Sequence, residues 1–246
     1  MIVDFFHAVI YVPLYNTLAF TVAWVPGGDV GVAIIIVTIL IKVILFPLAV
    51  RASKTQHAMR DLEPELTAIK EKNKGNNEAL ARATLALYKE HGVRPFASIL
   101  ILLIQIPIIL GLYWVILAEG TGGTFDPTLL YSFVVVPAVT SFSFLGLLPL
   151  KEGSIILAIL VAATQFWQAQ LLMPVAPTKT GKGFQDDLAS SMHLQMRYVF
   201  PVVLGAVAYV AGAAIALYFV TSNIFGIMQE IIAKRMHYGP REITSK

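Results

Sequence analysis

The stretch "VAIIIVTILIKVILFPLAV", residues 32–50, indicates what kind of protein this chain is. It contains nineteen residues and a single charge, Lys42, near its middle. As a helix that rises about 1.5 Å per residue, the stretch matches the roughly 30 Å hydrocarbon core of a bilayer. A lysine at that depth costs about 2.5–3.5 kcal/mol, yet the fourteen Val, Ile, Leu and Phe residues around it still favour insertion. The sequence therefore predicts a membrane span with a charge at its centre.

The composition of the whole chain supports a membrane location. Of the 246 residues, 57% are hydrophobic and 13% are charged, and the mean hydropathy is +0.74. Soluble domains usually contain about 25% charged residues. The chain has no cysteine, which excludes disulfides and thiolate metal sites. We therefore expect an all-α integral membrane protein.

Five stretches are apolar enough to cross a membrane, and they cover residues 31–50, 95–117, 154–172, 197–210 and 212–232. The last two form one apolar run from Tyr198 to Ile232. A single helix over that run would be about 50 Å long, more than a bilayer core requires. The run contains "GAVAYVAGAA", whose glycines and alanines allow the chain to reverse or helices to pack closely. We therefore predict two short, tightly joined helices.

The basic residues gather in two regions, and their distribution predicts the topology. Residues 51–94 hold nine of the eighteen Lys and Arg residues, and the tail 233–246 holds four more. The segment 118–153 holds one lysine against three acids. By the positive-inside rule, 51–94 and the tail are cytoplasmic, whereas 118–153 is extracytoplasmic. Five spans satisfy this pattern, with the N-terminus outside, and the loop 173–196 and the C-terminus on the cytoplasmic side.

The N-terminal stretch "FFHAVIYVPLYNTLAFTVAWV", residues 5–25, permits two interpretations. Its length allows a sixth span, which would place the N-terminus inside. Its His7, Asn16 and several Tyr and Trp residues suit a membrane interface instead. We predict that residues 1–30 form an interfacial amphipathic helix on the outer surface, ending in a turn.

Residues 51–94 form the one long polar segment. Apolar residues recur there at helical spacing before the turn sequence "KGNN" (74–77), and "EALARATLALYKEHG" follows with a second helical pattern. This pattern predicts a cytoplasmic helical hairpin. A solvated loop held by salt bridges is the plainer alternative to a hairpin that binds partners.

Lys42 stands out among the polar residues of the predicted spans. The others include Thr38, Gln105, Gln165, Gln168 and Tyr218. For a single Gln or Thr, a hydrogen bond between helices is the ordinary explanation. No span contains an Asp or Glu as deep as Lys42, so we expect water to be its partner. The spans are therefore predicted to enclose a hydrated cavity.

The motifs of common enzymes are missing from the sequence. The five histidines are scattered, and no two of them stand three or four residues apart. There is no glycine-rich phosphate loop, zinc-ligand spacing or nucleophile elbow. We expect no catalytic residue, no metal, no cofactor and no specific nucleic-acid partner.

Five motifs in order resemble the YidC/Oxa/Alb membrane-protein insertase family, in its short bacterial form. They are "VTILIKVILFPL", "ALYKEHGVRPF", "LLIQIPIILGLYWVI", "FWQAQLLMP" and "LYFVTSNIFGIMQ". Each motif alone is loose, but five at family-like spacing are specific. The family pattern also implies an outer N-terminal helix, five core spans and a cytoplasmic hairpin between the first two.

The resemblance implies a chaperone that inserts nascent membrane proteins through a hydrophilic groove open to cytoplasm and lipid. In the family a basic residue, usually arginine, lines this groove, and Lys42 matches it with Thr38 one turn earlier. A family tyrosine matches the "LYF" motif, which leaves open whether Tyr218 or Phe219 faces the groove. Whether the chain works alone or beside a Sec translocon, ribosome or targeting factor also stays open.

Two other functions compete with an insertase. A small anion channel or solute carrier could use Lys42 as its binding site, although the chain shows no internal repeat of the kind that builds many carriers. A scaffold for assembly without a translocation step would tolerate a neutral residue at position 42.

Overall fold

The computed structural model describes residues 2–93, 97–122, 124–172, 191 and 194–238. Most of the predicted loop 173–196 and the end of the tail 233–246 lie outside the described residues. The chain divides into two compact units. One unit contains Met1–Ile44 and Ile104–Ile227, and the other contains Leu45–Leu103 and Met228–Lys246.

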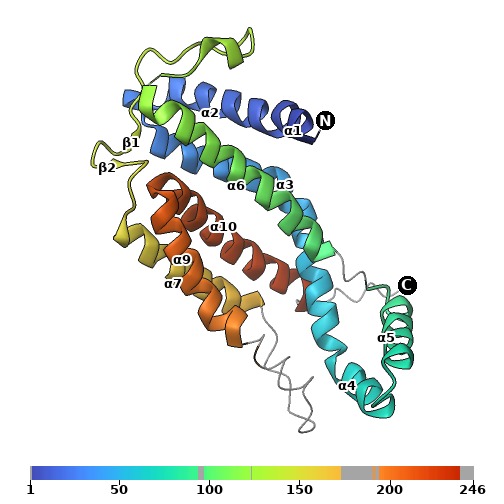
Figure 1. Ribbon diagram of the computed structural model, residues 1–246. Helices are drawn as coiled ribbons and strands as arrows, with labels where there is room; N and C mark the ends of the chain where they lie inside the picture. The colour runs from blue at the N-terminus through green and yellow to red at the C-terminus, as the bar shows by residue number, and fades with distance from the viewer. Residues whose placement is uncertain (1, 94–96, 123, 173–190, 192–193, 239–246) are drawn as a thin grey trace. The chain divides into compact units, whose positions relative to one another are not determined.

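The described residues are mainly helical (Figure 1). The elements are α1 (Ile2–Phe6), η1 (His7–Tyr11), α2 (Val12–Trp24), η2 (Pro26–Gly28), α3 (Val30–Asp61), α4 (Glu63–Lys72), α5 (Asn77–Glu90), α6 (Ala97–Gly122), η3 (Pro127–Leu129), β1 (Ser143–Phe144), β2 (Leu148–Pro149), α7 (Ile155–Leu172), η4 (Gln195–Val199), α9 (Phe200–Ala211) and α10 (Ala213–Tyr238). The two short strands pair antiparallel between α6 and α7, a feature that hydropathy did not predict.

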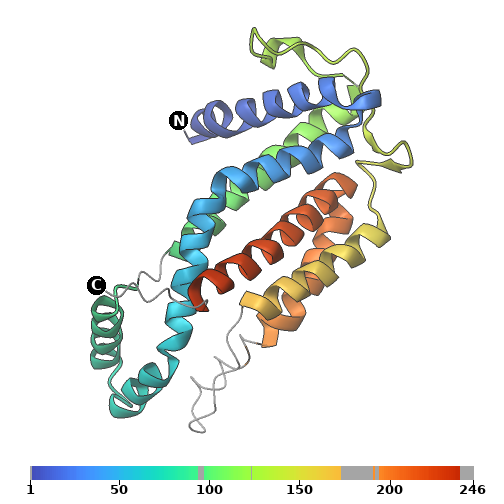
Figure 2. The same ribbon diagram turned by 180° about the vertical axis from the view of Figure 1, so that it is seen from behind.

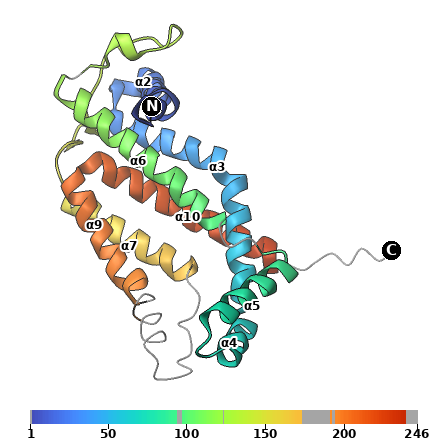
Figure 3. The ribbon, with the colours of Figure 1, turned by 45° about the vertical axis from the view of Figure 1, so that its right-hand side comes forward.

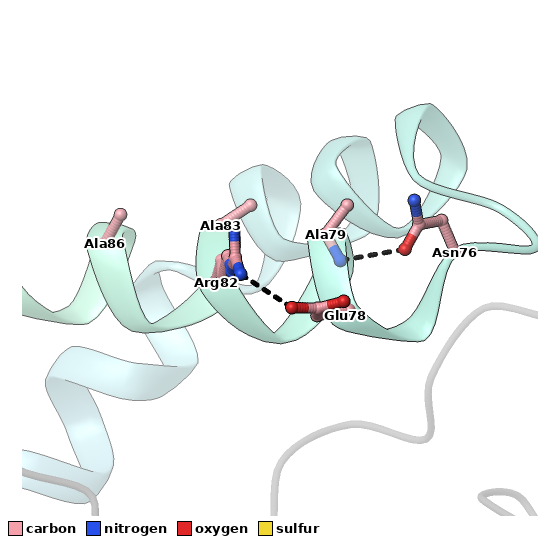
Figure 4. Close-up of a pocket in the computed structure, with 6 residues that line it drawn as sticks. All are labelled: Asn76, Glu78, Ala79, Arg82, Ala83 and Ala86. Carbon is pink, nitrogen blue, oxygen red and sulfur yellow. Dashed lines mark hydrogen bonds and ion pairs between the residues drawn. The ribbon is translucent and has the colours of Figure 1, made fainter.

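Polar side chains begin several of these helices. The Asp29 carboxylate accepts the amide of Val32 at 2.9 Å and so caps α3. In the same way, Ser154 caps α7 and Asn76 caps α5. Figure 4 shows the Asn76 cap beside an exposed ion pair of 2.6 Å between Glu78 and Arg82. These caps satisfy amides that the first helical turn leaves without a partner.

The helices suit a bilayer. By length and hydropathy, four described stretches can cross a membrane: Val3–Trp24, Val30–Asp61, Ile155–Leu172 and Ala213–Arg235. Leu103–Glu119 and Gln195–Ala211 are shorter apolar helices. Large apolar side chains remain exposed along them, for example Val43 on α3, Ile159 on α7 and Val210 on α9. Such faces are expected where lipid, not water, is the solvent. The chain is therefore an all-α integral membrane protein, with a small β-hairpin among its described residues.

The helix ends depart from the predicted span ends. The helix predicted to end at residue 50 continues to Asp61, so the first eleven residues assigned to the hairpin prolong α3. Likewise α6 runs to Gly122, and the α-helix of α9 starts at Phe200 after the π-helix η4. Hydropathy marks where a helix leaves the hydrocarbon, whereas backbone hydrogen bonds continue beyond that point.

The N-terminal helix has large apolar side chains on both sides, and its predicted place at the outer membrane surface stays a prediction. Its inner side is fully buried, as at Tyr15 and Leu18. Its outer side exposes the apolar Phe5, Phe20 and Trp24 together with the polar Asp4 and His7. The helix therefore packs on other helices along one side and exposes mainly apolar side chains on the other.

Close helix packing organises the first unit. Gly205 of α9 lies against α7, where an added Cβ would sit 2.8 Å from the Ala158 carbonyl oxygen. Between α9 and α10, Gly212 has a φ of +98°, and both helices run from this point toward the same end of the unit (Figures 2 and 3). The apolar run 198–232 is thus two helices that meet at one glycine.

Candidate functional site

Three polar side chains from three helices form one hydrogen-bonded cluster in the first unit. The Lys42 ammonium of α3 donates to Gln105 Oε1 of α6 at 3.3 Å. The amide nitrogen of Gln105 in turn donates to the Tyr218 hydroxyl of α10. We call Lys42, Gln105 and Tyr218 the Lys42 cluster. It joins segments far apart in the sequence.

Lys42 has a protein partner that the sequence did not predict. The sequence predicted water, which stays a prediction, and the structure adds a neutral amide oxygen. In the part of the chain that the structure describes, no ion pair includes Lys42. An amide orients a charge without neutralising it, so the positive charge remains available to an incoming anion.

Tyr218, not Phe219, joins the cluster. Both rings are buried and contact each other edge-on, at 5.7 Å between centroids. Only Tyr218 carries a hydroxyl, which meets Gln105. The hydroxyl therefore distinguishes Tyr218 from Phe219 as a member of the cluster, and which of the two faces a groove stays a prediction.

Thr38 occupies the helical turn before Lys42, but its hydroxyl is used locally. It donates to the Ile34 carbonyl oxygen at 2.6 Å, and the side chain is buried. This bond satisfies the hydroxyl within α3, as is common for threonine in apolar helices. Thr38 thus lies near the cluster in sequence, but its hydroxyl bonds within α3 instead.

The two predicted glutamines of α7 are half-buried, and among the described residues neither is bonded to the Lys42 cluster. The Gln168 amide packs against Gly226 of α10, where an added Cβ would meet its nitrogen. Gln165 lies one turn earlier on α7. A second polar contact between these helices joins Asn223 to the Thr164 hydroxyl at 3.1 Å. The sequence identified both residues as polar but did not predict that they meet.

The second unit holds a buried polar triad that sequence reasoning missed. Ser53 donates to Glu230 Oε2 at 2.6 Å, and His57 Nε2 lies 2.7 Å from Glu230 Oε1. All three side chains are at most 4% exposed. Ser53 and His57 stand four residues apart on α3, so both can face α10. That spacing was the one available signal, and it does not reveal the distant glutamate.

The chain is similar to known membrane proteins over most of its length. The family model described as 60Kd inner membrane protein matches residues 22–240. Membrane protein insertase YidC of Clostridium tetani is 31% identical over 86% of this chain and 84% of its own length. YidC of Fusobacterium nucleatum is 32% identical, over 82% of this chain and 85% of its own length. Membrane protein insertase MisCA of Bacillus subtilis is 29% identical, over 94% and 79%.

Proposed function

Because the chain belongs to the 60Kd inner membrane protein family, whose YidC and MisCA relatives are membrane protein insertases, we propose that it inserts membrane proteins through the Lys42 cluster. The resemblance drawn from the five motifs is confirmed, and the insertase function follows from it. Nascent membrane proteins are its substrates and the bilayer is its medium. The channel or carrier alternative has no support among these relatives.

One observation supports the role of the cluster: an ammonium in an apolar helix is bonded to a neutral partner. A substrate carboxylate that approaches Lys42 gains about 4 kcal/mol at 4 Å and an effective dielectric near 20, before desolvation. Gln105 and Tyr218 offer further polar atoms to a backbone or side chain that leaves water. The cluster would therefore lower the cost of moving a polar segment across hydrocarbon.

The apolar part of the substrate would follow a different route. Exposed apolar side chains flank the charge on α3, at Ile39 and Val43. A hydrophobic segment that slides along this surface reaches lipid without crossing water. Hydrophobic transfer, with the membrane potential acting on charges, would supply the driving force.

The topology belongs to the proposal. From the distribution of basic residues, we place the N-terminus and the α6–α7 connection on the outer side of a bacterial inner or plasma membrane. The α4–α5 hairpin and the C-terminus lie on its cytoplasmic side in this proposal. On this side the hairpin would meet a ribosome or targeting factor, and a Sec translocon could lie beside the bundle.

Reconstitution of the purified chain alone tests the proposed function. Liposomes that contain it should insert a single-span test protein with a short polar tail, measured as protection of the tail from added protease. Liposomes without the chain provide the baseline. Insertion at that baseline would contradict the proposal, and anion efflux from the same vesicles without insertion would restore the channel alternative.

A further inference from the structure

The loop between α6 and α7 is unusually apolar for a segment outside the helices. Residues 127–150 contain no charged residue and no histidine. Several large apolar side chains of this stretch are exposed. They are Phe133, Val135, Val139, Leu145 and Leu147, which range from 62% to 85% exposed. An exposed apolar group of this extent marks an interaction surface.

The loop is held in place, so its apolar side chains cannot simply fold inward. Asn16 of α2 donates to the Leu129 carbonyl oxygen and accepts the Tyr131 amide at 2.6 Å. Further along, the Ser141 amide donates to the Gly28 carbonyl oxygen at 2.8 Å. These bonds fix the backbone at both ends of the exposed stretch.

The turn between β1 and β2 also exposes an apolar side chain, at a residue whose backbone conformation is strained. Leu145 has a φ of +54°, a region that leucine rarely occupies and that Asn or Gly adopts readily. Its amide donates to the Asp29 carboxylate at 2.5 Å, which holds the turn on the start of α3. The side chain nevertheless points outward and is 62% exposed. In water this leucine would carry both a conformational and a solvation cost.

The apolar surface of the loop continues that of the helices on either side. Leu117 near the end of α6 and Ile155 and Ile156 at the start of α7 are exposed as well. Figure 1 shows the β1–β2 turn projecting from the end of the unit at which α3 and α7 begin. The lipid that surrounds the spans is therefore the nearest apolar phase to the loop.

We propose that the α6–α7 loop, residues 124–154, inserts its exposed apolar side chains into the adjacent leaflet of the bilayer. Irregular backbone is not tolerated in the hydrocarbon core, so the insertion is limited to the boundary between headgroups and acyl chains. Tyr131, which contacts Phe133 ring to ring, suits that depth. A protein partner is disfavoured because protein interfaces carry a polar rim, and the exposed stretch 127–150 offers no charge to form one.

Tryptophan fluorescence tests this insertion in liposomes of phosphatidylcholine and phosphatidylglycerol. The native Trp24, Trp114 and Trp167 are replaced by Phe, and Leu147→Trp is introduced as the reporter. Phosphatidylcholine brominated near the carbonyl end of its acyl chains serves as the quencher. We expect blue-shifted emission and a strong loss of intensity. In the matched control, Lys74→Trp in the α4–α5 turn, emission should stay red-shifted and unquenched.

Two results would overturn the proposal. Red-shifted, unquenched emission at position 147 would place the loop in water, and blue-shifted but unquenched emission would place it against a second copy of the chain. Phe133→Trp provides an independent reporter if the first variant folds poorly. Adding Leu145→Asn to Leu147→Trp should preserve the melting temperature, since asparagine tolerates positive φ, yet reduce the quenching.

Discussion

The partner of Lys42 within its membrane span is an amide and not an acid, so this contact brings no opposite charge to the ammonium. The sequence alone could single out Lys42 and Gln105, since a charge and an amide are conspicuous among Ile, Leu and Val. It could not show that they meet, because the bond depends on how α3 and α6 pack and on two long side-chain conformations. Tyr218 was named through the family motif, and its bond to Gln105 likewise required the structure.

Substitution of Glu230 tests the account at the level of single residues. Glu230→Ala leaves the buried Ser53 and His57 without the carboxylate they contact, so the free energy of unfolding should fall by about 1–3 kcal/mol for each polar group left unsatisfied. The melting temperature in detergent measures this loss. Glu78→Ala, which removes an exposed ion pair with Arg82, is the matched control and should change little. Equal melting temperatures for both variants would show that the triad does not stabilise the second unit.

At the scale of helices, hydropathy located the apolar segments better than their ends. The stretches around residues 31–50 and 154–172 lie in α3 and α7. The continuation of α3 to Asp61 was missed because Arg51–Asp61 is polar and still favours helix. The β1–β2 hairpin was missed because each strand has two residues, too few for an alternating pattern.

Gly212 determines how α9 meets α10. Gly212→Ala would put a Cβ 2.8 Å from the Lys151 carbonyl oxygen at a positive φ, so we expect a loss of at least about 1–2 kcal/mol in stability. Gly75→Ala is the matched control, because Gly75 also has a positive φ but nothing within 4 Å of the added Cβ. Melting temperatures of both variants separate the steric clash from the backbone preference. A greater loss for Gly75→Ala would refute the role of close packing at Gly212.

At the scale of the whole molecule, the proposed topology makes a prediction for two exposed sites. The chain has no native cysteine, so a thiol reagent labels only the single cysteine that is introduced. Lys74→Cys should react with a membrane-impermeant thiol reagent only after the cytoplasmic side is opened, and Asp126→Cys should react in intact cells. The reverse pattern would invert the orientation of the bundle.

The charge of Lys42 is tested most directly by insertion yield in liposomes, with substrates that differ only in acidic residues of the translocated segment. Lys42→Arg should insert all substrates. Lys42→Ala and Lys42→Glu should reduce the insertion yield of acidic substrates by up to about tenfold, and that of neutral substrates less. A tenfold change corresponds to about 1.4 kcal/mol, which is the part of the attraction of about 4 kcal/mol that would remain after desolvation. The melting temperature of Lys42→Ala should be unchanged or higher, because the cost of burying a charge disappears. Equal insertion of every substrate by Lys42→Ala and the unmodified chain would contradict electrostatic attraction as the mechanism.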